Sequence, residues 1–414
     1  MSTAAPTPEL SRLQQGVLTA STAFAGLAIP TSTAAQNIST LALLLCWLGI
    51  GPLRAQLSAV LRLPLVRACL AFYLLLMVGT LWAEVDWSAR LQMLNRMRAY
   101  LLAPVFVACL MHHKARAGLI MGFCAGVALS VAVSMGLAAT GLAIMEATPG
   151  NYPSFRTHTE HNLFIAWMVV ALLSALLWGQ IQERRLRMAA IVLIALLLFD
   201  AFFLVRGRTA QVLLLLMIAL VLLRRWGLRA ALPMLLGTAI LLPALYLTSP
   251  VIRNGVTQAL SNLEDLSQGQ HGENSLGLRV EFAQNTLKII EEAPILGHGT
   301  GSFRANYQSL TGFTKAANGP HASHNPHNDY LWLWSEVGLL GPLGLLAVLA
   351  ALVASAQKLS KPQGVTAEAV ALSMLLGTLG NSFFTDNVSG IGFIVVACAL
   401  AAGSWCLSPR SEAT

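Results

Sequence analysis

The sequence is dominated by apolar runs of about 17–25 residues, the length that crosses a bilayer as a helix. These runs recur along all 414 residues, of which 56% are hydrophobic and only 11% charged, where a soluble domain carries about 25% charged residues. Because lipid offers no partners to backbone polar groups, each run must be helical. We therefore expect an all-α polytopic membrane protein with about twelve transmembrane helices, at residues 13–29, 35–51, 66–82, 98–111, 117–141, 161–179, 187–205, 209–223, 230–247, 328–355, 366–384 and 390–407.

The distribution of Lys and Arg predicts the topology. Basic residues are concentrated in the short segments that share a side with both termini, which indicates that both termini are cytoplasmic. Residues 1–247 then hold spans one to nine, residues 248–327 form one large loop on the opposite side, and residues 328–414 hold spans ten to twelve and a cytoplasmic tail. The net charge of +8 is spread over many loops, so we expect no nucleic acid partner.

All six cysteines lie inside apolar runs, where they are expected to be small buried hydrophobes rather than disulfide partners or metal ligands: Cys46, Cys69, Cys109, Cys124, Cys398 and Cys406. The first apolar run is preceded by little positive charge and is expected to be a retained first span.

Six arginines fall in the short loops of the outer side, where basic residues are usually avoided: Arg90, Arg96, Arg98, Arg156, Arg206 and Arg208. Arg206 and Arg208 lie in the tight hairpin FFLVRGRTAQVLLLL between two spans. They are either helix-end arginines that reach the interface or an anion site, because paired guanidinium groups suit phosphate geometry. We favour the anion site, since ionisable groups within a membrane are usually functional. Arg96 and Arg98 open a span and could equally anchor it.

The large outer loop contains a predicted helix, SLGLRVEFAQNTLKIIEEAP, which Ser275 could cap and Pro294 ends. Leu278, Phe282 and Ile289 fall on one face, so the helix would lie on the membrane or over a cavity. Arg279 in its first turn opposes the helix dipole, which indicates either a role away from the helix or a pair with Glu281 or another carboxylate. The following glycine turn, ILGHGTGSF, is too weak a signal for a phosphate-binding loop.

Polar residues elsewhere on the outer side are less informative. His158 and His161, in RTHTEHNLF, are expected to form an outward-facing cluster, in either a structural or a functional role. Glu160 is expected to be an ordinary solvated residue.

The densest polar stretch is HASHNPHNDYLWLWSEVGLLG, residues 321–341, where three histidines precede a hydrophobic helix. They could hold a metal, hydrogen-bond within the loop, or supply a general base with a pKa near neutrality. The intervening proline and the lack of an HxxxH pattern disfavour the metal. No Asp-x-Asp is present to hold Mg²⁺, but arginines can stabilise a diphosphate leaving group without a metal, so we expect no cofactor. The ligand would be a lipid phosphate or pyrophosphate with its tail in the bilayer.

Three motifs within residues 200–345 resemble those of the O-antigen ligase and polymerase superfamily. His327 and Asn328, followed after nine residues by Gly338 to Gly341, resemble the signature of bacterial O-antigen ligases. Arg279 followed by PILGHGTGSF and the RGRTAQ hairpin at 206–211 resemble the superfamily's arginine motifs.

The resemblance implies a GT-C-type membrane fold with a large periplasmic loop that contains helices. It implies transfer of O-antigen polysaccharide from undecaprenyl pyrophosphate to the lipid A–core of lipopolysaccharide, with inversion and no metal, at the periplasmic face of a bacterial inner membrane. By the motifs, His327 would be the base and Arg206, Arg208 and Arg279 would bind pyrophosphate. Arg98 and His324 are further candidates by position, and Asn328 by its place beside His327.

Three other functions are compatible with the sequence. An O-antigen polymerase would use the same donor with a different acceptor, and a protein O-oligosaccharyltransferase is a third member of this class. A transporter of an anionic solute is the alternative from another class. Because the unusual polar residues gather at one face rather than at the membrane midplane, we favour interfacial chemistry and, within it, the ligase.

Overall fold

The computed structural model describes residues 9–267 and 275–406, and these residues are all-helical, with no β-strand among them. The all-α part of the predicted fold class is therefore confirmed for the described residues. Its helices are α1 (Arg12–Thr31), α2 (Thr33–Gly49), α3 (Gly51–Ala55), α4 (Leu57–Val60), α5 (Pro64–Gly79), α6 (Trp87–Arg96), α7 (Arg98–Leu110), α8 (His113–Thr140), α9 (His158–Leu177), α10 (Arg184–Phe199), η1 (Asp200–Leu204), α11 (Arg208–Trp226), η2 (Gly227–Ala230), α12 (Ala231–Thr248), α13 (Pro250–Ser267), α14 (Ser275–Glu292), α15 (Phe303–Thr311), α16 (Lys315–Asn318), η3 (Gly319–His321), α17 (Asp329–Val337), α18 (Leu340–Ala356), α19 (Lys361–Gly377) and α20 (Asn387–Cys406).

Within the described residues, six helical segments are long and apolar enough to cross a membrane: Trp87–Leu110, His113–Thr140, His158–Leu177, Arg184–Leu204, Arg208–Thr248 and Asn387–Ser404. Three apolar helices are shorter, α2, α5 and α18. Predicted span ten, 328–355, is not one helix, because Gly338 adopts φ +67 and separates α17 from α18. Predicted spans eight and nine both fall within the segment Arg208–Thr248, where Gly227 adopts φ +63 and the 3₁₀ turn η2 joins α11 to α12.

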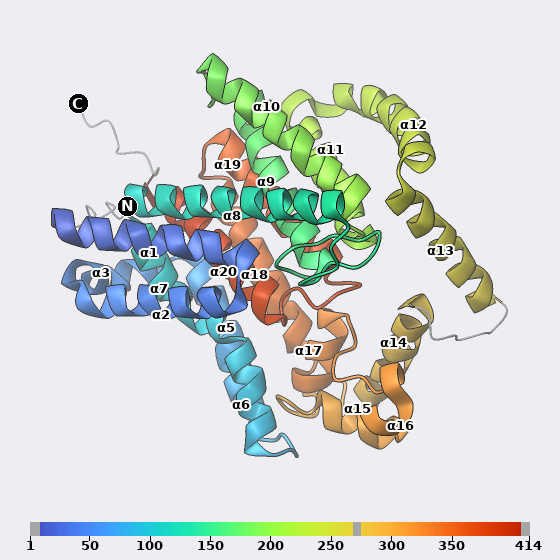
Figure 1. Cartoon of the computed structure of the whole chain (residues 1–414). Coiled ribbons are helices and arrows are strands. Elements are labelled where there is room, and N and C mark those ends of the chain that lie inside the picture. The colour runs from blue at the N-terminus through green and yellow to red at the C-terminus, as the bar shows by residue number, and fades with distance from the viewer. Residues whose placement is uncertain (1–8, 268–274, 407–414) are drawn as a thin grey trace.

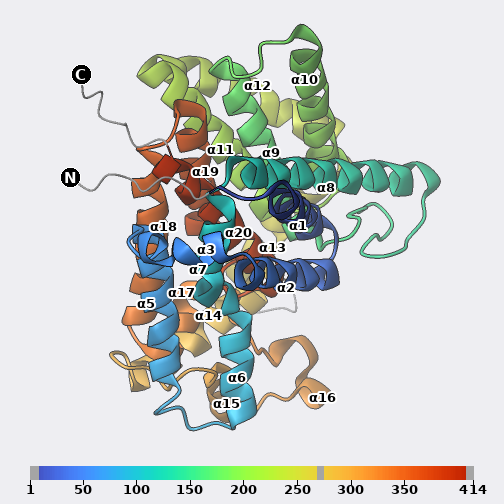
Figure 2. The same ribbon diagram turned by 90° about the vertical axis from the view of Figure 1, so that its left-hand side faces the viewer.

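Small residues let the first helices approach closely. The helices α1 and α8 run side by side in both views (Figures 1 and 2). An added Cβ at Gly122 of α8 would lie 1.9 Å from the carbonyl oxygen of Ala23 in α1, and one at Gly26 would lie 2.1 Å from that of Leu119. Glycine at these positions therefore sets the helix separation, as small residues do in membrane bundles.

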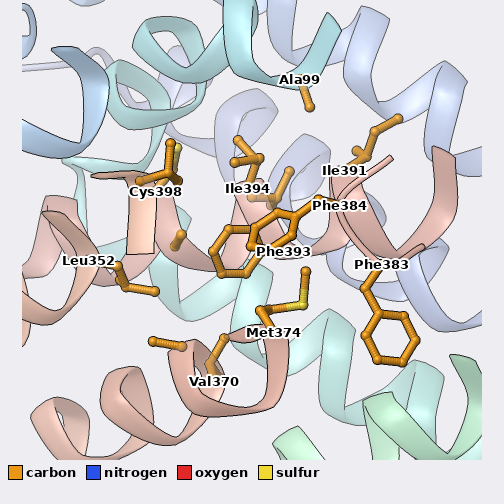
Figure 3. Packing of buried hydrophobic residues seen from close by; sticks show 14 of the residues in the cluster. Ala99, Leu352, Val370, Met374, Phe383, Phe384, Ile391, Phe393, Ile394 and Cys398 are labelled. Atoms are coloured by element: carbon orange, nitrogen blue, oxygen red, sulfur yellow. The ribbon is translucent and has the colours of Figure 1, made fainter. Parts of the chain in front are cut away.

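The core of the bundle is built around α20 and its neighbours, with aromatic side chains at its centre (Figure 3). Phe384 and Phe393 meet edge to face with ring centroids 5.3 Å apart. Met374 of α19 and Cys398 of α20 are fully buried in the same cluster. Five of the six cysteines have described side chains, and all five are free thiols, in agreement with their expected role.

The predicted helix in the large loop is confirmed as α14, and Phe282 and Ile289 are buried on its inner face. In Figure 1 the helices α14 to α17 gather at one end of the molecule, away from both termini. Residues 294–302 form the glycine turn that follows α14 and lead into α15.

Two expectations for the outer loops are wrong, because α9 begins at His158, and Glu160 and His161 lie inside it. His161 is 3% exposed, and its Nε2 lies 2.8 Å from Oδ2 of buried Asp200 in the π-helix η1. Glu160, 8% exposed, is likewise buried instead of solvated.

Candidate active site

His327 lies in a tight turn immediately before α17. Its backbone has φ +54, the left-handed region, which histidine enters more readily than most residues but at an energetic cost. The His327 N–H donates to Oδ1 of Asn325 over 2.7 Å, which holds the turn. Asn328 caps α17, because its Oδ1 accepts from the backbone N–H of Leu331 at 3.1 Å. Asn328 therefore orients the helix that follows His327.

The His327 ring stacks on Phe282 of α14, with centroids 6.0 Å apart and planes 26° apart, while its edge remains exposed to solvent. Partial burial lowers the pKa of His327 below its ordinary value, and the positive charges of Arg279 and His324 lower it further. A depressed pKa keeps the imidazole neutral at neutral pH. His327 can therefore accept a proton from a hydroxyl group at this surface.

Arg208 and Arg279 come together from elements far apart in sequence. Nη2 of Arg208 donates to Oγ of Ser275, the first residue of α14, over 3.0 Å. Burial lowers the pKa of Arg279, and the charge of Arg208 lowers it further, as expected for two cations close together. The predicted alternative, an ion pair between Arg279 and Glu281, is wrong: none of the ion pairs of the described residues joins them, and Oε2 of Glu281 lies 2.7 Å from Nδ1 of His321.

Arg206 is exposed at the tip of the hairpin between η1 and α11. Its backbone N–H donates to Oδ1 of Asn151 over 2.8 Å, but its guanidinium makes no hydrogen bond within the described residues. The charges of Arg206 and Arg279 both act on His158 at the start of α9. Among the ion pairs of the described residues, none joins Arg206, Arg208 or Arg279 to a carboxylate. These arginines can therefore serve as an anion site.

A buried polar cluster fixes the arginine hairpin in place. The final turn of α10 widens into the π-helix η1, which begins at Asp200, the partner of His161. Nε2 of Gln211 in α11 donates to the carbonyl oxygen of Ala201 over 2.8 Å. An added Cβ at Gly207 would lie 2.4 Å from Nδ2 of Asn162, so the hairpin fits closely against α9.

The guanidinium groups of three other outer arginines bind the protein itself. Arg98 donates to Oδ1 of Asn387 over 2.9 Å and to Oδ1 of Asn37 over 2.6 Å, which joins α7 to α20 and α2. Arg156 is buried and donates to the last carbonyl groups of α1. Arg90 donates to three backbone carbonyl groups after α5. None of these contacts brings Arg98 to His327. The hydrogen bonds of Arg98 instead stabilise the packing of α7 against α20 and α2.

His324 is exposed, and the charges of a second group of cations act on it. Burial lowers the pKa of His324, followed by the charges of Arg96, Arg304 and Lys315. The Arg96 guanidinium also lies over the Trp332 ring, 5.3 Å from its centroid. The sequence pattern left open whether Arg96 anchors a span, and it singled out neither Arg304 nor Lys315. Arg96, Arg304 and Lys315 form no motif with His324 in the sequence, so the sequence did not indicate that their charges act on it.

The three histidines of the polar stretch do not converge. His321 faces Glu281, whereas His327 stacks on Phe282. In the part of the chain that the structure describes, no three His, Cys, Asp or Glu side chains are arranged to hold a metal ion.

The glycine turn after α14 packs against α17. The N–H groups of His298 and Gly299 donate to the carbonyl oxygens of Ser335 and Glu336, over 2.9 and 2.7 Å. An added Cβ at Gly338 would lie 1.8 Å from the Ile295 carbonyl oxygen. Because these backbone N–H groups already donate to carbonyl groups of α17, they are not free to bind a phosphate. The turn instead fixes the position of the helix that follows His327.

Asp329 is a site residue that sequence reasoning missed. Its carboxylate is fully buried and accepts from the backbone N–H of Phe384 over 2.7 Å and from the hydroxyl of Thr385. It thereby ties the start of α17 to the loop between α19 and α20. An acidic residue in the first turn of a helix was the available signal, but that position also suits a solvated acid.

Residues 194–346 match the family whose model is described as O-antigen ligase. The matched region contains His327, Asn328, His324 and the three arginines of the anion site, whereas Arg98 lies outside it. No curated protein matched the chain. Together with the motifs, this match supports the assignment of residues 194–346 to the O-antigen ligase/polymerase family.

Proposed function

We propose that this protein is an O-antigen ligase, an enzyme of lipopolysaccharide biosynthesis that transfers O-antigen polysaccharide from undecaprenyl pyrophosphate to lipid A–core. One observation carries the proposal. Arg279 and Arg208 lie together without a carboxylate partner in the described residues, beside a histidine whose pKa Arg279 lowers. Cations aimed at a leaving group and a neutral base are what metal-independent glycosyl transfer requires.

In the proposed reaction, a hydroxyl oxygen of the acceptor sugar attacks the anomeric carbon of the donor. The His327 imidazole accepts the hydroxyl proton as the new C–O bond forms. The bond from the anomeric carbon to the pyrophosphate oxygen breaks, and undecaprenyl pyrophosphate leaves with the electron pair. Arg206, Arg208 and Arg279 stabilise the charge that develops on the leaving group. Attack opposite the leaving group inverts the anomeric centre.

The second group of cations supports an anionic acceptor. Arg96, Arg304 and Lys315 act on His324, whereas Arg279 acts on His327. Lipid A–core carries phosphate groups, which are suitable ligands for these cations.

The proposed orientation follows from the ends of the helices. Arg184, Arg185 and Arg187 lie at the start of α10, and Arg206 lies just beyond the π-helix that ends it. With the arginine-rich start of α10 in the cytoplasm, Arg206 and the large loop face the periplasm, and both termini are cytoplasmic. The GT-C-type architecture is part of the same proposal, as is the bacterial inner membrane.

Complementation of a bacterial strain that lacks its O-antigen ligase tests the proposal. Expression of this chain should restore lipopolysaccharide capped with O-antigen, seen as a ladder on a gel. A polymerase, a protein O-oligosaccharyltransferase or a transporter would leave the lipid A–core uncapped. Uncapped lipopolysaccharide, with the protein present in the membrane, would reject the ligase assignment.

A further inference from the structure

A short loop outside the matched region contacts both Arg279 and the turn that contains His327. Residues 378–386 connect α19 to α20 and lie against the start of α17. Nδ2 of Asn328 donates to the carbonyl oxygen of Leu379 over 3.1 Å, and the Phe384 N–H donates to the Asp329 carboxylate over 2.7 Å. Both ends of the loop are therefore attached to the helix that follows His327.

Ser382 in this loop supports the turn that contains His327. Its hydroxyl is buried, with the residue 8% exposed, and donates to Oδ1 of Asn325 over 2.6 Å. The same Asn325 oxygen accepts the His327 N–H over 2.7 Å. Because His327 has a left-handed backbone, its conformation must be maintained by its surroundings. Ser382 fixes the side chain that maintains it.

The preceding residue, Asn381, contacts the anion site. Its Oδ1 lies 3.5 Å from Nη2 of Arg279, a long hydrogen bond. Its Nδ2 is buried and has no hydrogen-bond partner in the described residues. Buried amide donors are rarely left unpaired, and in this position the donor lies beside an arginine assigned to the pyrophosphate. A phosphate oxygen bound by Arg279 would be a suitable acceptor for it.

We propose that Asn381 and Ser382 are positioning residues that together set the spacing between Arg279 and His327. Two consecutive residues of one anchored loop hold the anion site and the base, so the two groups move as a unit. Displacement chemistry requires the base and the leaving-group contacts on opposite sides of one carbon, and small errors in placement slow it severely. The inference rests on the proposed function, in which Arg279 binds pyrophosphate and His327 accepts the proton.

The test uses the full-length protein in detergent, with undecaprenyl pyrophosphate-linked O-antigen and lipid A–core. Ser382→Ala should lower kcat by about tenfold with the donor KM unchanged, because a neutral hydrogen bond supports only the base. Ser382→Thr, which keeps the hydroxyl, should restore most of the rate. Asn381→Ala should raise the donor KM by about tenfold, because it removes a contact with Arg279.

Ser373→Ala is the matched control. Ser373 is also a buried serine whose hydroxyl forms a side-chain hydrogen bond, with Trp167 at 2.9 Å, but it lies within α19 away from the loop. This variant should leave kcat and the donor KM unchanged. The thermal unfolding midpoint of each variant separates loss of fold from loss of positioning.

Two readouts do not depend on turnover. Hydrogen exchange at the His327 amide should accelerate in Ser382→Ala but not in Ser373→Ala, and calorimetry with inorganic pyrophosphate should show weaker binding by Asn381→Ala. An inactive wild-type protein would reject the proposed function, while these two readouts would still test the loop. Wild-type exchange in Ser382→Ala together with wild-type pyrophosphate affinity in Asn381→Ala would overturn the inference.

Discussion

At the scale of single residues, the outer arginines divide according to what their guanidinium groups already bind. Arg98 donates to side-chain amides of two other helices, and Arg156 donates to the end of α1. Arg206 makes no side-chain hydrogen bond in the described residues, and Arg279 makes one long one. A guanidinium that donates several hydrogen bonds to the protein stabilises the fold, whereas Arg206, Arg208 and Arg279, with at most one such bond each, remain available to a ligand.

This division predicts opposite effects for two substitutions. Arg279→Ala should lower kcat/KM for the donor by about 10- to 100-fold, because a charge-assisted hydrogen bond contributes about 1.5–3 kcal/mol. Arg98→Ala should lower the thermal unfolding midpoint while the donor KM of the remaining folded protein stays near wild type. Steady-state kinetics with a thermal unfolding assay compares the two. A donor KM that rises in Arg98→Ala with normal stability would contradict the assignment.

The depressed pKa of His327 predicts the pH dependence. A general base acts when neutral, so kcat/KM should fall on the acid side with an apparent pKa below 6.5, the ordinary value of histidine. The charge of His324 lowers the pKa of His327. In His324→Gln this effect is lost, the pKa of His327 rises, and the acid limb should move to higher pH. A pH–rate profile measures the limb, and a shift to lower pH would contradict the proposed electrostatics.

The proposed principal site residues carry recognisable patterns in the sequence, but their surroundings do not. His327 and the Arg206 hairpin carry local patterns, a polar stretch before a helix and two arginines between spans. Asp329, Asn381 and Ser382 carry no such pattern, because a single acid, amide or hydroxyl gains its role from a contact 55, 102 or 57 residues away in sequence, respectively. Nothing in the sequence around them specifies that contact.

At the scale of elements, the proposed site residues lie next to interruptions in the helices. The predicted span 328–355 divides at Gly338, where α17 and α18 separate and the turn at Ile295 inserts. The π-helix η1 ends α10 just before Arg206. Apolar composition predicts that both segments are helical, but it does not distinguish a straight helix from a broken one. The breaks depend on close backbone contacts that form only in the folded bundle.

Gly338 provides a test at this scale. Gly338→Ala should destabilise the protein by about 1–3 kcal/mol, because alanine is strained at φ +67 and its Cβ would overlap the Ile295 carbonyl. Gly136→Ala in α8 is the control, since an added Cβ there meets nothing within 4 Å. Thermal unfolding in detergent compares them. Equal midpoints for the two variants would show that the glycine turn does not fix α17.

At the scale of the whole molecule, the polar groups of the site gather at one end of a helical bundle. The loop helices α14 to α16 lie beside α17 at that end, far from the termini (Figure 1). From the Lys and Arg positions we predict that this end lies on the side of the membrane opposite the termini, because topology depends on the basic residues of whole loops. The span count was harder to predict, since short helices such as α2, α5 and α18, with 16 or 17 residues, lie at the lower limit of a full crossing.

The whole-molecule account also predicts how transfer responds to metal removal. The proposed steps use arginines to stabilise the leaving group, so ligation by purified protein should proceed at the same rate after EDTA treatment. Product formation on a gel, with and without EDTA, measures this. Loss of turnover in EDTA that Mg²⁺ restores would show that a metal, and not arginine alone, supports departure of the pyrophosphate.

The most direct test of the central claim is transfer by purified full-length protein from undecaprenyl pyrophosphate-linked O-antigen to lipid A–core. Wild-type protein should form capped lipopolysaccharide, and His327→Ala should reduce the rate by about 10²- to 10⁴-fold, the contribution expected of a general base. His321→Ala is the matched control, because His321 faces Glu281, and it should retain most of the activity. Wild-type activity in His327→Ala would contradict the account.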